Sequence, residues 1–94
     1  MNPSEKTLPL PYRLVLIEWL NAGRLSDGWM ELSEVPDPLP RVCVSVGSVV
    51  AESPGCKILV PTIADVERGE GSLVYGGMRI PVWAIVSERD LMAG

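Results

Sequence analysis

The stretch that decides the fold is Val42-Cys43-Val44-Ser45-Val46-Gly47-Ser48-Val49-Val50-Ala51. One face of this segment would carry Val42, Val44, Val46 and Val50, and the other Cys43, Ser45, Gly47 and Val49. Such a two-residue repeat is typical of a half-buried β-strand, because successive side chains of a strand point to opposite faces. Gly47 in mid-strand indicates a bend or bulge, a feature that curls a sheet into a small barrel.

The residues that follow predict a hairpin. Residues 52–55 (ESPG) are suited to a turn, and residues 57–61 (KILVP) return as the partner strand. In that register Cys56 faces about residue 51 and Cys43 faces about residue 64, which is far beyond the span of a disulfide. We therefore expect two reduced, partly buried thiols.

Residues 12–20 (YRLVLIEWL) admit two interpretations. Leu14, Ile17 and Leu20 are three apart, as on a helix face, whereas Val15, Ile17 and Trp19 alternate, as on a strand. A strand is favoured because the run is short, rich in β-forming residues and preceded by Pro11. Such a strand is apolar on both faces, and a small barrel has only one interior. The second face must be covered by the N-terminal arm, by residues 24–41 or by another subunit. This predicts a homo-oligomer, most simply with two-fold symmetry.

The remaining segments complete an all-β chain. Residues 1–11 hold three prolines and predict an extended N-terminal arm, and residues 12–91 predict one small open barrel of about five strands. Residues 24–41 are rich in turn residues, with a short strand or one helical turn at 29–32, and residues 62–72 predict a charged loop. A strand over 73–80 is broken at Gly76-Gly77. A last turn and short strand cover 83–89, and Leu91 is expected to close the core.

Charge and composition limit the partners. The chain has 8 basic and 12 acidic residues and a net charge of −4, and its basic residues are scattered. Duplex nucleic acid and anionic membrane surfaces are therefore not expected partners. No apolar run is long enough to cross a membrane and the first residues show no signal pattern, so we expect a cytoplasmic protein.

Catalytic motifs are lacking in the sequence. The chain has no His, so the commonest general base is missing and a Ser-His or Cys-His pair cannot form. No phosphate-binding glycine loop is present. Asp65 and Glu67 are a carboxylate pair that a metal-dependent enzyme would use, but a solvated loop explains them more simply. We expect no enzyme activity, no cofactor and no metal.

Aromatic and arginine side chains supply the candidate ligand-binding residues, since aromatic faces and guanidinium groups bind nucleotides and other planar anions. The candidates are Trp29, Arg41, Tyr75, Arg79 and Trp83. Other interpretations stay open: Trp19 and Trp83 are most simply core or core-edge residues, and the arginines are most simply surface groups.

Three segments carry a resemblance: residues 45–53 with Ser45-Val46-Gly47, residues 56–61, and residues 80–85 (IPVWAI). Together they resemble a group of small phage and bacterial proteins, which implies an SH3-like small barrel and a phage or prophage origin. Those proteins often carry Lys or Arg after the Ile-Pro pair, where this chain has Val82, so no basic role is expected there.

These observations predict a non-enzymatic, oligomeric binding protein of phage type in the host cytoplasm. Its ligand would be a small signalling nucleotide held between subunits, or a host protein. The nucleotide option rests on analogy in size and origin with small phage proteins that sequester immune cyclic nucleotides. The main alternative is a structural or assembly component of a phage particle or complex. An enzyme using carboxylates and a metal is a weaker third possibility.

Overall fold

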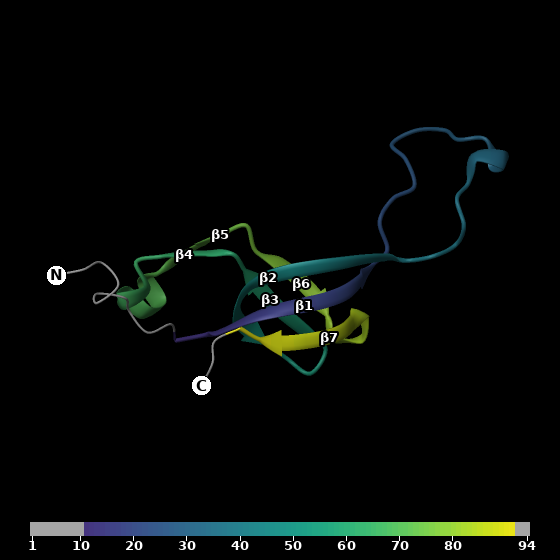
Figure 1. Cartoon of the computed structure of the whole chain (residues 1–94). Coiled ribbons are helices and arrows are strands. Elements are labelled where there is room, and N and C mark those ends of the chain that lie inside the picture. Colours follow the sequence, from purple (N-terminus) through teal and green to yellow (C-terminus); the bar gives the residue numbers. More distant parts are fainter. Residues whose placement is uncertain (1–10, 92–94) are drawn as a thin grey trace.

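Five antiparallel strands form the main sheet of the computed structural model, which describes residues 11–91 (Figure 1). Their order is β6-β3-β2-β1-β7. The strands are β1 (Arg13–Asn21), β2 (Arg41–Glu52), β3 (Cys56–Val60), β6 (Met78–Pro81) and β7 (Ile85–Asp90). A separate two-stranded hairpin pairs β4 (Thr62–Ala64) with β5 (Leu73–Tyr75). Three short 3-10 turns complete the chain: η2 (Leu32–Glu34), η3 (Val66–Gly71) and η4 (Val82–Ala84).

Most of the expected strands are present. Residues 13–21 form a strand, so the helical alternative is wrong. The break at Gly76-Gly77 and the final turn and strand are also confirmed. The loop expected over 62–72 is wrong in detail, since it holds β4 and η3. Residues 29–32 form neither a strand nor a full turn, because the 3-10 turn begins only at Leu32.

The core lies on one face of the curled sheet. Val15, Ile17, Val49, Leu59 and Ile80 are buried together there. Trp19 and Ile85 pack against them, and the indole Nε1 of Trp19 donates to Ser45 Oγ at 2.9 Å. In β2 the buried face is therefore that of Ser45, Gly47 and Val49, while Val42, Val44 and Val46 point outward.

Gly47 is required by a close approach of two strands. A Cβ atom at this position would lie 2.6 Å from the backbone oxygen of Val60, closer than real Cβ contacts. The register irregularity of β2 falls later, between Val49 and Ala51, so the bulge expected at Gly47 is displaced along the strand.

The pairing of β2 with β3 corrects the register expected for the cysteines. Ala51 pairs with Ile58, so residue 51 does not face Cys56. β4 pairs with β5, so Cys43 does not face residue 64. Both thiols are nevertheless free and half-buried, as expected.

The described strands do not close into a barrel, because β6 and β7 end the sheet on opposite sides. The predicted barrel is thus confirmed only as a mostly β chain with one five-stranded antiparallel sheet. Two expected core contacts are wrong: Trp83 is 80% exposed on η4, and Leu91 is exposed after β7.

Two appendages project from opposite ends of the sheet (Figure 1): the loop of residues 22–40 and the β4–β5 hairpin. The described part of the chain measures 62 × 28 × 26 Å, with a radius of gyration of 17.6 Å. A compact chain of this length has a radius of gyration of roughly 12 Å. Residues 1–10 of the expected N-terminal arm lie outside the described residues.

Candidate binding site

A hollow of about 650 Å³ lies where the loop leaves the sheet. Its walls come from the two legs of the loop and the strand ends that carry them: Asn21, Gly23, Arg24, Leu25, Val35, Pro36, Asp37, Pro38, Leu39 and Arg41. We call it the loop-base hollow. It exists because β1 and β2 pair to their ends, with Asn21 opposite Arg41, so the two legs begin side by side.

Local chemistry keeps the loop irregular. Pro36, Pro38 and Pro40 cannot donate backbone hydrogen bonds, which prevents β2 from extending further into the loop. On the other leg Ser26 Oγ donates to Gly28 O at 2.7 Å and accepts from Gly28 N at 3.4 Å, which is a side-chain-stabilised turn. The loop is thus bounded by paired strands and shaped by its own residues.

Two arginines, Arg24 and Arg41, line the loop-base hollow, together with Asp37. Neither arginine takes part in an ion pair within residues 11–91. Leu25 and Leu39 supply apolar wall beside them. Unpaired planar guanidinium groups next to apolar surface suit a small anion that also has a flat, weakly polar part.

The five residues predicted from the sequence do not gather in one place. Arg41 lines the loop-base hollow, and Trp29 lies in the same loop but is fully exposed outside the hollow's walls. Tyr75 is exposed at the end of β5, and Trp83 is exposed on η4. Arg79 lies on β6, so it belongs to a different part of the sheet from Arg41.

Arg79 borders two smaller open hollows on the outer side of β3 and β6. One, of about 270 Å³, includes Cys56 and Ile58, and the other, of about 280 Å³, includes Ile58 and Met78. Among the described residues that line these two hollows Arg79 is the one cation, so they offer less to an anion than the loop-base hollow.

The sequence analysis missed Arg24 as a site residue. The sequence did contain a signal for this residue, because Arg24 follows the first predicted strand and Arg41 precedes the second. Antiparallel pairing of those strands would bring the two arginines to the same end of the sheet.

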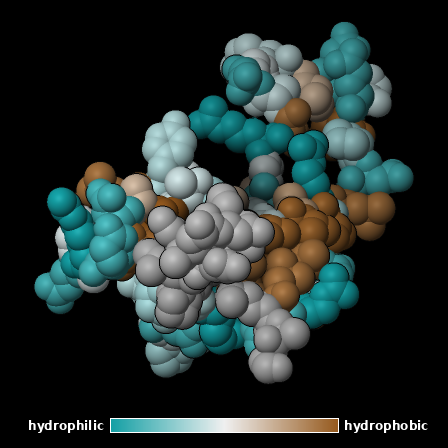
Figure 2. Space-filling model, turned by 60° about the vertical axis from the view of Figure 1, so that its left-hand side comes forward, coloured by the Kyte–Doolittle hydropathy of each residue, from teal (hydrophilic) through white to brown (hydrophobic). Residues whose placement is uncertain are grey.

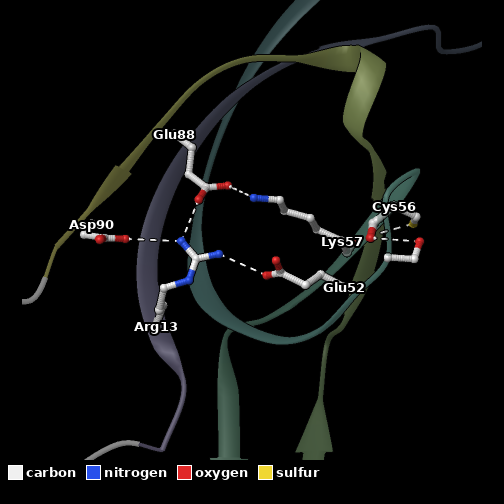
Figure 3. Close-up of polar contacts among 7 residues, drawn as sticks. Arg13, Glu52, Cys56, Lys57, Glu88 and Asp90 are labelled. Atoms are coloured by element: carbon white, nitrogen blue, oxygen red, sulfur yellow. Dashed lines mark hydrogen bonds and ion pairs between the residues drawn. The ribbon is translucent and has the colours of Figure 1, made fainter.

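The sequence analysis also missed an ion network that joins four strands (Figure 3). Arg13 contacts Glu52, Glu88 and Asp90 at 3.0, 2.8 and 3.5 Å, and Lys57 Nζ lies 2.6 Å from Glu88 Oε1. The hydrogen bond from Lys57, with that from Arg13, lowers the pKa of Glu88 although burial opposes the shift. Hydrogen bonds to Glu88 and Glu52 raise the pKa of Arg13. The cations are engaged by carboxylates, so the network ties β3 to β7 rather than presenting a free charge.

Residues 11–91 contain neither a cluster of metal ligands nor a membrane-spanning helix. No group of three or more Cys, Asp or Glu residues is arranged there to hold a metal ion, and Asp65 and Glu67 have no third partner. In the same range no helix has the length and apolar character needed to cross a membrane.

Comparison with known proteins adds no identity. The chain matches no protein-family model, no curated protein and no solved structure. The function is therefore inferred from the loop-base hollow and the exposed surfaces of the described residues.

Proposed function

We propose that this chain is a non-enzymatic, homo-oligomeric binding protein of phage type that sequesters a small signalling nucleotide in the host cytoplasm. The observation that carries the proposal is the loop-base hollow, with Arg24 and Arg41 both free of ion pairs within the described residues. Phosphate groups of a nucleotide are natural acceptors for two guanidinium groups.

The dimensions and surroundings of the hollow support a small ligand. Its volume of about 650 Å³ falls within the usual range of ligand sites. Trp29, in the same loop, offers an exposed aromatic face on which a base could stack. Tyr75, Arg79 and Trp83 lie elsewhere, so in this proposal they would act only from another subunit.

Binding without catalysis is supported by the residue types present. The chain has no His, and no side chain lining the loop-base hollow is a thiol or a hydroxyl. The guanidinium groups can hold an anion, but the hollow lacks an obvious nucleophile and a neutral base.

We further propose that the sheet belongs to an SH3-like open barrel. Support comes from the strand order β6-β3-β2-β1-β7, the 3-10 turn that leads into the last strand, and the pairing of that strand with the first. The ion network between β3 and β7 would assist such curling by linking strands that are not neighbours in the sheet.

A second candidate is an assembly component of a phage particle or complex. The elongated shape and the exposed apolar side chains of the loop, among them Leu25, Leu32 and Leu39, favour this alternative. Binding of a host protein by the same loop would use the same residues.

Calorimetric titration with cyclic di- and trinucleotides tests the proposal. We expect saturable binding, and Arg24→Ala and Arg41→Ala should each weaken it at least tenfold. Arg68→Ala, an exposed arginine of η3 outside the hollow, is the matched control and should retain the parental affinity. Absence of heat with every nucleotide would reject the nucleotide proposal and leave the assembly role as the better explanation.

A further inference from the structure

The first half of β2 is a strand with one open edge. β1 pairs with β2 along Arg41 to Val49, but β3 pairs with β2 only from Ser48 onward. Within residues 11–91, the segment Arg41–Val46 therefore has no strand on the side away from β1. We call it the open edge. Its unpaired backbone donors and acceptors form a template for another strand.

The side chains of the open edge are also uncovered. Val42, Val44 and Val46 point to the outer face and are 61%, 61% and 50% exposed. Their cross-strand neighbours on β1 are Leu20, Glu18 and Leu16, all half-buried, so one carboxylate lies beside Val44 on this otherwise apolar face. Figure 2 shows hydrophobic surface on the body close to the base of the projecting loop. The loop of residues 22–40, one of the covers expected from the sequence, extends beyond the ends of β1 and β2 (Figure 1) and leaves the three valines exposed.

We propose that the open edge pairs antiparallel with the open edge of a second copy of this chain about a two-fold axis, joining the two sheets into one. This inference rests on the proposed homo-oligomer and names its interface. Pairing two identical edges satisfies the free backbone groups of both copies in a single closed contact.

The sequence of the open edge complements itself. A two-fold axis perpendicular to the sheet keeps each face on its own side, so residues of equal parity meet. With the axis at Cys43, Val42 faces Val44 of the second copy; with the axis at Val44, Val42 faces Val46. The axis at Val44 joins all three valines of each copy in a continuous ladder, whereas the axis at Cys43 pairs Val42 with Val44 and leaves Val46 facing Pro40. Cross-strand pairs of β-branched residues stabilise sheets. Each Arg41 then lies opposite an uncharged residue, Ser45 or Gly47, so like charges stay apart.

Exposed apolar side chains of the loop would add to the interface if the second copy covers them. Besides the three valines, the loop exposes Leu25, Trp29, Leu32, Val35 and Leu39. A standard interface buries about 800 Å² per partner, more than three half-exposed valines supply, so the contact of the loop with the second copy is a necessary part of the dimer.

The geometry of the antiparallel pairing also provides a cover for the loop. Each loop joins β2 at Arg41, which pairing places beside Ser45 or Gly47 of the other copy. At Gly47 the backbone of Val60 passes close by, and β3 continues from there into the β4–β5 hairpin. The loop of one copy would thus run toward the hairpin of the other, whose Leu73, Val74 and Tyr75 are exposed.

The first test is the molar mass measured by light scattering during size-exclusion chromatography. The wild-type chain should elute with twice its mass of 10.2 kDa. The Val44→Lys variant should elute as a monomer or dimerise at least 100-fold more weakly. Each copy would place an ammonium group in the ladder, opposite its equivalent with the axis at Val44 and opposite Val42 with the axis at Cys43. Val44 is exposed in the monomer, so circular dichroism should show an unchanged fold. Val86→Lys, on β7 and 58% exposed, is the matched control and should remain dimeric.

The second test checks with the natural cysteines that the two open edges face each other. In Cys56→Ser, a short bis-maleimide should join Cys43 of one copy to Cys43 of the other, since both registers place the two within about 8 Å. In Cys43→Ser, the remaining Cys56 lies on β3 beyond the ladder and should give little cross-linked dimer.

Four results would overturn the inference. A dimer that survives Val44→Lys, or a dimer in which Cys43 does not cross-link, places the interface elsewhere and leaves the proposed function standing. A wild-type monomer at about 100 µM rejects both the interface and the homo-oligomer, while nucleotide titration still judges ligand binding separately. A monomer that dimerises only after deletion of residues 1–10 would show that the arm occupies the edge.

Discussion

The two halves of β2 share one alternating sequence but differ in their surroundings. From Gly47 to Glu52 the strand passes from β1 to β3, pairing with both at Ser48 and Val49, and Gly47, Ser48 and Val49 are buried. From Arg41 to Val46 it has β1 on one side only, and its valines are exposed. A period of two establishes that a segment is a strand. The strands that pair with the segment, and the residues that pack on it, decide which face is covered and whether its edge is free.

Gly47→Ala, which adds one methyl group, is the substitution that we expect to destabilise the buried half of β2 (Gly47 to Glu52) most. Gly47→Ala should lower the free energy of unfolding by about 3 kcal/mol, because the new Cβ meets backbone that cannot rotate away. Urea unfolding followed by tryptophan fluorescence measures the change.

Gly28→Ala is the control for this substitution, since nothing lies within 4 Å of a Cβ built there. It should alter the free energy of unfolding by less than about 0.5 kcal/mol. Equal effects of the two substitutions would show that the close approach of β2 and β3 is not what constrains Gly47.

The same Val-to-Ala substitution in each half of β2 compares how much the two halves contribute to stability. Val49→Ala removes two buried methyl groups from the core and should cost about 2 kcal/mol of unfolding free energy. Val44→Ala, on the exposed half of the same strand, should cost less than about 0.5 kcal/mol at concentrations where the chain is monomeric. If Val44→Ala were as costly as Val49→Ala, the outer face would have to be covered within the single chain.

The smallest expected change in the free energy of unfolding comes from the ion network of Arg13, Lys57 and Glu88, beside the buried half of β2. The lowered pKa of Glu88 means that its contribution to stability is present above the ordinary value of 4.5 and is lost as pH falls below it. Glu88→Gln should remove about 1 kcal/mol at pH 7 and flatten the decline in stability below pH 4.5. Thermal unfolding between pH 7 and pH 3 measures both changes.

Asp90→Asn provides the comparison within the network. Its contact with Arg13 is the longest, at 3.5 Å, and its side chain is mostly exposed. The substitution should therefore change stability less than Glu88→Gln does. The reverse order would show that the link between β3 and β7 through Lys57 and Glu88 is not the stabilising part of the network.

Short-range sequence patterns predicted most of the strands but not how the strands pair within the sheets. The valine alternation, the turn at Ser53-Pro54-Gly55 and the break at Gly76-Gly77 are short-range signals, and the elements follow them. The pairing of β4 with β5 and the exposure of Trp83 depend on contacts between distant segments. The bulge after Val49 depends on how β3 crosses β2, and no single residue in β2 announces it.

The candidate site was predictable only in part for the same reason. Arg41 was identified from its residue type, but its neighbour Arg24 became visible only once β1 and β2 were paired to their ends. Tyr75, Arg79 and Trp83 were grouped with Arg41 by chemistry, and the topology distributes them over other elements. The network around Arg13 joins residues up to 77 positions apart, which a linear pattern does not indicate.

The closing pair of Asn21 and Arg41 has an evolutionary consequence. Because β1 and β2 pair up to these two residues, residues can be inserted or exchanged in the loop beyond them without disturbing the core. Doubling the length of a flexible loop costs only about 0.6 kcal/mol. The chain thus separates the residues that hold the two strand ends together from the residues of the loop that they support. Related sequences could diverge in what they recognise while folding in the same way.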